Sequence, residues 1–299
     1  MTLYYADHFV LPLPPGHRFP MEKYARLRDT LASSGAFSPD AFRVPDAATD
    51  EQILRAHDRE YLGRVVSGAL SAAEIRAIGF PWSPAMVERS RRSAGATVAA
   101  ARDALAQGWS ANLAGGTHHA FRDRGEGFCV FNDAAIAARA MQAEAGIARV
   151  AIIDCDVHQG NGTAAILRGD DSVFTFSIHG ARNFPFRKEE SDLDIELPDG
   201  TGDEAYLAAL REGLDEALAR SRPQLAIYLA GADPHEGDRL GRLSVTREGL
   251  AARDALVLER LWQGGIPVAI AMAGGYGSDI SDTVAIHAAT ILTARGLWS

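Results

Sequence analysis

Three residue types that bind metal ions occur at alternate positions in one short stretch, as Asp154, Asp156 and His158. The apolar, β-branched run 150–153 precedes them and is typical of a strand covered on both faces of a parallel sheet. Glycines follow His158, which indicates that the strand ends here in a loop. Because open α/β sheets bind ligands outside the carboxyl ends of their strands, this stretch predicts part of a metal site. An acidic loop that caps the next helix, with a surface histidine, is the alternative.

A third metal ligand is expected from a different strand. A catalytic zinc usually takes three protein ligands from His, Asp or Glu and leaves one position open for water. Asp156 and His158 supply two of these groups, and Asp233, which follows the apolar run 224–231, is the natural third. A metal held in this way polarises a carbonyl and lowers the pKa of a bound water from ~15.7 towards ~7. The sequence therefore predicts a hydrolytic metal centre.

The adjacent residues His118 and His119 are candidates for acid–base chemistry beside that metal. They follow the glycine pair 115–116, which allows close approach of the backbone to a ligand. One imidazole can take a proton from water, and an imidazolium can deliver one to the leaving group. Asp154 and Asn161 are the expected partners that fix the two tautomers. We expect His118 beside Asp154 to be the more cationic, because an anion raises the pKa of an imidazole. A purely structural histidine pair is the alternative.

Tyr276 is a candidate oxyanion donor. It follows Gly274 and Gly275 at the end of the apolar run 266–272. Its phenol can donate a hydrogen bond to the negative charge that develops on a carbonyl oxygen. A core tyrosine at a strand end is the alternative, although glycines offer the ring few local packing partners.

The rest of the sequence predicts the elements that position these residues. Short apolar strands are expected at about 110–114, 150–154, 172–178, 224–231 and 266–272, with helices at about 133–145, 203–219 and 246–263. Nearer the start, we expect a strand at 3–5, helices at 21–34, from 57 and at about 84–107, and a loop at 79–84. This alternation is typical of parallel βαβ units. Five strands end in glycine and polar residues, so their His, Asp and Tyr side chains should gather at one edge of one sheet.

Composition limits the class of protein. The 299 residues are 47% hydrophobic and 23% charged, and without repeats or composition shifts we expect one domain over 1–299. The net charge of −9 argues against direct nucleic-acid binding. With no apolar run of about 20 residues and no signal peptide, we expect a soluble, cytoplasmic protein without a membrane span. Cys129 and Cys155 are expected to be reduced, buried thiols. The sequence leaves the oligomeric state open.

Together, the motifs resemble those of the zinc-dependent histone deacetylases and their bacterial relatives, which have the arginase/deacetylase fold. The matching stretches are 115–120, 127–133, 154–162, 229–241 and 274–276. The resemblance implies a three-layer α/β fold in which helices flank a mostly parallel central sheet. Within the family, segments 123–125, 158–162 and 236–244 look most like the class IV branch.

The resemblance also implies roles for individual residues. Asp156, His158 and Asp233 are similar to the ligands of Zn²⁺, with Fe²⁺ as the alternative metal. The implied catalytic residues are His118, His119 and Tyr276, with Asp154 and Asn161 as partners of the two histidines. The implied substrate-binding residues are Gly127, Phe128, Phe184 and Gly275, with Phe128 and Phe184 as opposite walls of an acyl-lysine tunnel. Arg18 resembles a basic residue near the exit for acetate.

A structural monovalent cation, K⁺, is also implied behind the zinc. Its ligands would be the carboxylate of Asp154, the hydroxyl of Ser177 and the backbone of Asp156, His158 and Ile178.

The implied activity is hydrolysis of an N-acyl amide. The expected substrate is acetyl- or longer acyl-lysine in a protein or peptide, and an acetylpolyamine or another small N-acyl amine is the alternative. The related arginases and agmatinases, with two manganese ions, need another carboxylate soon after the histidine, where Gln159 and Gly160 stand here. A non-catalytic acyl-lysine binder is an alternative from a different class, although every residue needed for turnover is present.

Overall fold

Parallel strands form the centre of the computed structural model, which describes residues 1–298. Within this range, eight strands make one sheet in the order β2-β1-β3-β8-β7-β4-β5-β6, and every neighbouring pair is parallel. The strands are β1 (Leu3–Tyr4), β2 (Phe42–Arg43), β3 (Trp109–Asn112), β4 (Val150–Asp154), β5 (Val173–Gly180), β6 (Leu193–Leu197), β7 (Leu225–Leu229) and β8 (Val268–Ala271). Parallel neighbours need crossover connections, and helices supply most of them.

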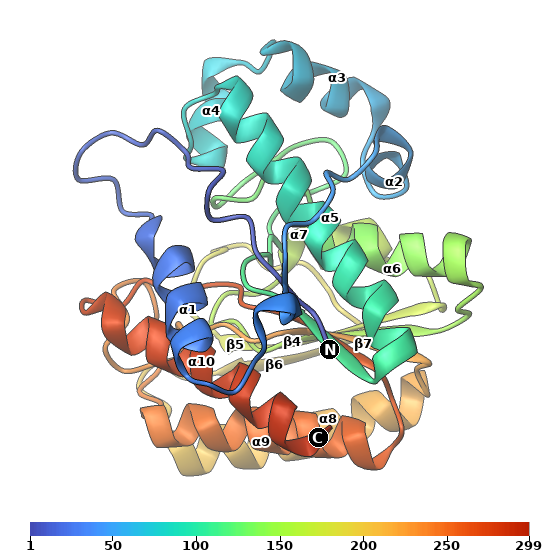
Figure 1. Ribbon diagram of the computed structural model, residues 1–299, viewed down its shortest axis with the longest axis vertical. Coiled ribbons are helices and arrows are strands. Elements are labelled where there is room, and N and C mark those ends of the chain that lie inside the picture. Colours follow the sequence, from blue (N-terminus) through green and yellow to red (C-terminus); the bar gives the residue numbers. More distant parts are fainter. Residues whose placement is uncertain (299) are drawn as a thin grey trace.

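Helices cover both faces of the sheet, which gives three layers (Figure 1). The described helices are α1 (Glu22–Ser33), α2 (Asp50–Leu54), α3 (Arg59–Ser67), α4 (Ala72–Ile78), α5 (Pro84–Gln107), α6 (Asp133–Ala145), α7 (Asn161–Leu167), α8 (Asp203–Ser221), α9 (Arg247–Gln263) and α10 (Ile280–Leu297). In Figure 1, α5 and α6 lie above the sheet, and α8, α9 and α10 lie below it. Among the helices of residues 1–298, none combines the length and the apolar character needed to cross a bilayer.

The central strands are apolar because both of their faces are covered. Every residue of β4 and β7 is buried, and their side chains divide between two hydrophobic cores, one on each face. Ile152 and Ile227 belong to the core under α5 and α6, whereas Ile153 and Tyr228 belong to the core over α8 and α9. This explains the absence of polar alternation in these strands.

The register of the sheet brings the strand ends together. Asp154, the last residue of β4, is paired with Leu229 of β7 and with Ser177 of β5. Leu229 is in turn paired with Ala271, the last residue of β8. The loops that follow β4, β7 and β8 therefore begin side by side at one edge of the sheet, which is where ligands bind in open α/β folds.

The sequence predicted the central elements better than the peripheral ones. All the expected strands and helices are present, with ends shifted by a few residues, but β2, β6, α2, α4, α7 and α10 were not predicted. The expected loop 79–84 has its aromatic side chains turned inward. Phe80 is buried, and Trp82 Nε1 donates to the carbonyl of Val65 at 2.8 Å. Both cysteines are free thiols and are buried.

Candidate active site

Two carboxylates and one imidazole meet at the carboxyl edge of the sheet. Asp156 and His158 lie in the loop after β4, and Asp233 lies in the loop after β7. Each residue offers one ligand atom, and these atoms all lie within 4.8 Å of one another. His158 Nδ1 is 2.9 Å from Asp156 Oδ1 and 3.2 Å from Asp233 Oδ2. The fold therefore brings together the three residues that the sequence proposed as metal ligands.

Backbone amides hold the two carboxylates in position. Asp156 Oδ1 accepts from the N–H of His158 at 2.9 Å, and Asp156 Oδ2 accepts from the N–H of Gly274 at 2.7 Å. Asp233 Oδ1 accepts from the N–H of Val157 at 2.9 Å. A Cβ at Gly274 would collide with a carboxylate oxygen of each aspartate, so only glycine allows this close approach.

The residues of this cluster fit a divalent metal ion. Asp233 Oδ2 is buried and accepts no well-formed hydrogen bond from the described residues, an arrangement that is costly unless a cation binds there. Burial and the nearby charge of Asp156 raise the pKa of Asp233 to about 7. Burial lowers the pKa of His158, but the hydrogen bond with Asp156 and the nearby charges of Asp156 and Asp233 outweigh this effect and raise the pKa to about 10. The cluster thus favours positive charge, and its mixed nitrogen and oxygen donors suit a catalytic zinc site.

The histidine pair lies beside this cluster, and each ring has a different partner. His118 Nδ1 is 2.6 Å from Asp154 Oδ2, and His119 Nδ1 is 2.7 Å from Asn161 Oδ1. Burial lowers the pKa of His118, but the charges of Asp154 and Asp156 raise it to about 9. Burial and the charges of the neighbouring imidazoles hold the pKa of His119 well below its usual value. The surroundings of His118 therefore favour its charged form, and those of His119 favour its neutral form.

Tyr276 is held in the loop after β8. Its backbone N–H donates to Asp238 Oδ2 at 2.6 Å, and the same carboxylate accepts from the N–H groups of Leu240 and Gly241. Burial and the charges of Asp156 and Asp233 raise the pKa of Tyr276 well above its ordinary value. The phenol therefore keeps its proton at neutral pH and can act as a hydrogen-bond donor.

Sequence reasoning missed a buried lysine beneath Tyr276. Lys23, on α1, is 2% exposed, and its Nζ donates to the carbonyls of Ala273 and Gly275, each at 3.3 Å. The same Nζ lies 5.3 Å from the centre of the Tyr276 ring. These contacts join α1 to the glycine-rich turn that carries the phenol. The one signal in the sequence was a lysine next to the apolar stripe of a predicted helix.

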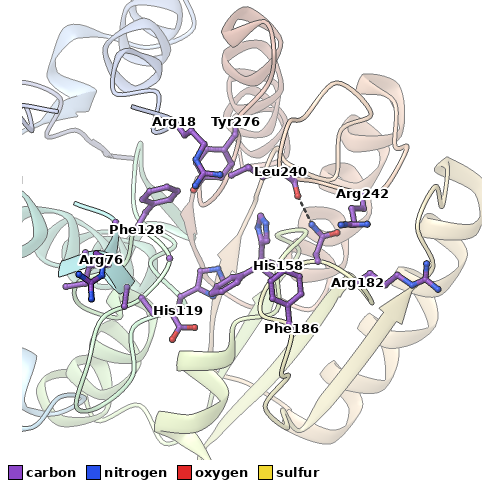
Figure 2. Close-up of a pocket in the computed structure, with 17 residues that line it drawn as sticks. Arg18, Arg76, His119, Phe128, His158, Arg182, Phe186, Leu240, Arg242 and Tyr276 are labelled. Atoms are coloured by element: carbon purple, nitrogen blue, oxygen red, sulfur yellow. Dashed lines mark hydrogen bonds between the residues drawn. The ribbon is translucent and has the colours of Figure 1, made fainter. Parts of the chain in front are cut away.

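A cavity of about 670 Å³ opens over the cluster (Figure 2). Its lining residues are Arg18, Arg76, Ala77, Ile78, Gly79, His119, Glu126, Gly127, Phe128, His158, Arg182, Asn183, Phe184, Phe186, Leu240, Arg242 and Tyr276. In Figure 2, His119 and His158 lie near its centre, and Phe128 and Phe186 lie on different sides. Three of the four expected substrate-binding residues therefore line it.

The fourth residue, Gly275, is not among the lining residues. It turns the chain behind Tyr276, at a φ of +148°. Arg18, which resembles a basic residue near the exit for acetate, is exposed and lines the cavity. The buried cation found next to Tyr276 is Lys23.

Two phenylalanine side chains, those of Phe184 and Phe128, line the cavity near the histidines. The ring of Phe184 meets that of His119 edge to face, with centroids 4.9 Å apart. Phe128 has a φ of +66°, which is rare for a bulky residue, and it is held there by a hydrogen bond from its N–H to the carbonyl of Ile78 at 2.7 Å. Such backbone strain is concentrated at functional sites.

Residues 17–292 match the model of the histone deacetylase domain. The chain belongs to the histone deacetylase family. It is 33% identical to Histone deacetylase 2 of Arabidopsis thaliana over 87% of this chain and 70% of that protein. It is 35% identical to a histone deacetylase-like amidohydrolase of Pseudomonas aeruginosa over 82% of this chain and 68% of that protein. An uncharacterized protein of Picosynechococcus sp. is 42% identical and is aligned over 99% of both chains.

Solved structures show the same fold. A histone deacetylase homologue in complex with SAHA superposes with a TM-score of 0.83 at 23% identity, over 99% of this chain and 84% of that chain. The HD domain of HDA15 superposes with a TM-score of 0.82 at 22% identity, over 100% of this chain and 90% of that chain. With these relatives, the chain is a hydrolase of the deacetylase family, a metal-dependent family that acts on acylated amides.

Deeper polar contacts support the deacetylase site from below. The guanidinium of Arg253 on α9 is fully buried, and it donates to the carbonyls of Cys155 and Gly231, next to two of the candidate ligands. Asp254 pairs with Arg253 and accepts from the hydroxyl of Tyr228 at 2.6 Å. The sequence did not indicate these contacts, because Arg253 and Asp254 lie on a different element from Cys155, Tyr228 and Gly231.

Two of the K⁺ ligands implied by the resemblance, Asp154 and Ser177, lie on neighbouring strands. Asp154 Oδ1 accepts from the N–H of Asp156 at 3.1 Å, and Asp154 is the register partner of Ser177 on β5. Ile178 follows Ser177 and is fully buried.

Proposed function

We propose that this deacetylase-family enzyme hydrolyses acetyl- or longer acyl-lysine in proteins or peptides, with Zn²⁺, or Fe²⁺ as the alternative, held by Asp156, His158 and Asp233. One observation carries the proposal: three ligand atoms within 4.8 Å of one another lie beneath a cavity that His119 and Tyr276 also line. When bound, the metal supplies Lewis acidity, which polarises the acyl carbonyl and makes water more acidic. The remaining steps depend on side chains of the chain itself.

His119 is the proposed general base. Asn161 Nδ2 donates to Glu126 Oε1 at 3.0 Å, which turns the amide oxygen of Asn161 towards His119 Nδ1. That oxygen can only accept, so Nδ1 carries the hydrogen and Nε2 is free to accept a proton from the attacking water. The depressed pKa of His119 keeps the ring neutral and ready for this step.

His118 is the proposed cationic partner. Its Nε2 lies 3.8 Å from Asp156 Oδ1, and it is not among the residues that line the main cavity. The protonated His118 therefore acts through its charge, while His119, once protonated, is positioned to deliver a proton to the departing amine.

Tyr276 is the proposed oxyanion donor, and aromatic rings are the proposed walls for the acyl-lysine chain. The protonated phenol donates to the carbonyl oxygen as negative charge develops there, in a buried site where such a bond is strong. Phe128 and Phe184 flank the path to the histidines and offer apolar surface to the lysine stem.

An arginase-like reaction with two manganese ions has no comparable support. The residue after His158 is Gln159, and its amide donates to the carbonyl of Glu189 at 2.7 Å and to Asp194 at 2.9 Å. Within residues 1–298, one group of three ligand side chains was found and no second group beside it.

The experiment that tests the proposal is hydrolysis of a panel of acyl-lysine peptides. Acetyl and longer acyl groups are both included, because segments 158–162 and 236–244 resemble the class IV branch. Chelation should abolish turnover, and Zn²⁺ or Fe²⁺ should restore it, with one metal ion per chain. Failure to cleave any acyl-lysine with either metal would contradict the proposal, and two manganese ions per chain would favour the arginase-like reaction.

Two structural proposals accompany this function. We propose a K⁺ site at Asp154 and Ser177, completed by backbone of Asp156, His158 and Ile178. It is supported by the pairing of β4 with β5. We also propose that residues 1–299 act as one domain, since one sheet contains strands from both ends of the described chain.

A further inference from the structure

Four arginines surround the mouth of the cavity. Arg18, Arg76, Arg182 and Arg242 are all exposed, and Glu126 is the one carboxylate residue that lines the cavity with them. In Figure 2, Arg76 lies on one side of the opening, Arg182 and Arg242 lie on the opposite side, and Arg18 lies near Tyr276. The chain as a whole has a net charge of −9, so this positive region contrasts with the average surface.

Most of this positive charge is not neutralised by the protein. Arg182 and Arg242 share a single carboxylate, Asp199, at 4.0 Å and 3.3 Å. Arg18 and Arg76 make no ion pair with any described residue. Exposed ion pairs of this kind are weak, so the guanidinium groups remain available to a ligand.

The four arginines come from four separate segments. Arg18 precedes α1, Arg76 lies on α4, Arg182 follows β5, and Arg242 lies between β7 and α9. Arg182 and Arg242 share Asp199 and so lie together on one side of the opening, whereas Arg76 lies on the other side. An extended peptide with negative groups on both sides of its modified lysine can use both sides of the mouth.

We infer that the cavity mouth selects acyl-lysine in acidic peptides, with Asp or Glu on both sides of the modified lysine. This inference rests on the proposed function and names its substrate class. Guanidinium groups form bidentate hydrogen bonds with carboxylates, and charges at the rim of a site mainly raise the association rate of ligands of opposite charge. The same charges repel polycations, so acetylpolyamines are poor substrates for this enzyme.

The test compares peptides that share one acyl-lysine and differ in their neighbours. Two Asp, two Ser or two Lys residues stand on each side, and N-acetylputrescine is a fourth substrate. For the metal-loaded enzyme at low salt, kcat/KM for the Asp peptide should exceed that for the Lys peptide by about tenfold or more. The ratio should fall towards one at about 1 M salt, where the screening length is about 3 Å.

Charge reversal at the mouth identifies the residues responsible. In the double variant R182E/R242E, the preference for Asp over Lys peptides should disappear or reverse. R211E on α8 is the matched control, because Arg211 is exposed and is not among the residues that line the cavity. The R211E variant should keep the wild-type preference for Asp over Lys peptides. A second variant, R76E, tests the other side of the opening.

The outcomes separate this inference from the proposed function. If the peptides are cleaved but the Lys peptide or N-acetylputrescine is preferred, or R182E/R242E keeps the wild-type ratio, the inference is wrong and the deacylase proposal stands. If nothing is cleaved, the proposed function fails. In that case, fluorescence anisotropy measures the binding of labelled Asp and Lys peptides and tests the inference separately. The inference requires that the Asp peptide bind more tightly than the Lys peptide, that salt weaken this binding, and that R182E/R242E remove the difference.

Discussion

At the floor of the cavity, Asp156 and Asp233 are 1% and 0% exposed, whereas at its mouth Arg182 and Phe186 are about 80% and 86% exposed. The floor residues accept hydrogen bonds from backbone amides of neighbouring loops, each anchored to a buried strand. The mouth residues lie on loops and on the short helix α4, with weak ion pairs or none. The difference indicates that the reaction depends on fixed geometry, whereas the choice of substrate depends on side chains that change at little cost in stability.

The floor is a network in which the loss of one member leaves others unsatisfied. Asp156 and Asp233 have buried charges that need donors or a cation, and Arg253 below them is itself a buried charge paired with Asp254. Removing one partner of such a pair is strongly destabilising, because the other charge stays buried. At the mouth, water replaces any lost contact. Variants of the two regions should therefore differ in the size of their effects.

Asp233→Asn is expected to have the largest effect. Asn keeps an oxygen that can accept from the N–H of Val157 but loses the negative charge that faces His158. Mutation of a residue that only supports a metal ligand typically lowers metal affinity by about 10–100-fold. Loss of a ligand itself should therefore lower metal affinity by at least about 10²-fold, and turnover should fall with it. Atomic emission on the purified protein and kcat/KM for an acyl-lysine peptide measure both effects. Asp215→Asn, at an exposed ion pair, is the control. Full metal content together with wild-type turnover in this variant would show that Asp233 is not a metal ligand.

Tyr276→Phe should lower turnover by about 10²–10³-fold while the fold and the metal content stay unchanged. The backbone N–H of residue 276 still donates to Asp238, so the loop keeps its anchor and the variant lacks only the hydroxyl. The loss should appear in kcat, because the hydrogen bond strengthens as charge develops on the carbonyl oxygen. A variant with the kcat of the wild type would show that another group stabilises the oxyanion.

Lys23→Met tests a residue that belongs to the floor although it comes from a distant helix. Without Nζ, the carbonyls of Ala273 and Gly275 lose their donor, and the turn before Tyr276 should shift. A displacement of 1 Å costs about 10²-fold in the worst case, and we expect a loss of kcat of about tenfold. Lys23→Arg, which can still donate to both carbonyls, should recover part of it.

A double variant tests whether Lys23 acts through Tyr276. Lys23→Met should have little further effect on kcat in a Tyr276→Phe background, because both changes disable the same hydrogen bond. Independent, multiplicative losses would mean that Lys23 supports the fold in general rather than the phenol.

The same contrast explains what could be predicted from the sequence. The strands β4 and β7 are recognisable as unbroken apolar runs, and in a parallel sheet their carboxyl ends must share an edge. Asp156, His158 and Asp233 follow those runs directly, so composition and order along the chain were sufficient to bring them together. Buried positions allow few residue types, so the residues at the floor of the cavity could be predicted from the sequence.

Other features depend on contacts that the sequence does not reveal. Lys23 and Ala273 are 250 residues apart, and nothing in either segment indicates that they meet. The edge strand β6 is as long as β4 but lacks an unbroken apolar run, because it contains Asp194 and Glu196. The helix α10 was missed because it is apolar on most sides and lacks the polar stripe that marks a surface helix. At the mouth, Phe186 and the four arginines lie outside any regular pattern, because exposed positions tolerate most residues.

Of the four single substitutions, at Asp233, Tyr276, Lys23 and Phe186, Phe186→Ala should have the smallest effect. Its ring is exposed and stands against Phe184, with ring centroids 6.3 Å apart. Most residues at a binding surface cost less than about 1 kcal/mol of binding free energy when truncated to alanine, so KM for an acyl-lysine peptide should rise by about twofold, with kcat and the melting temperature unchanged. Trp262→Ala, at another exposed aromatic on α9, is the matched control and should leave KM unchanged. A tenfold loss in kcat for Phe186→Ala would mean that the mouth takes part in the chemical step, and the division between a fixed floor and an adjustable mouth would be wrong.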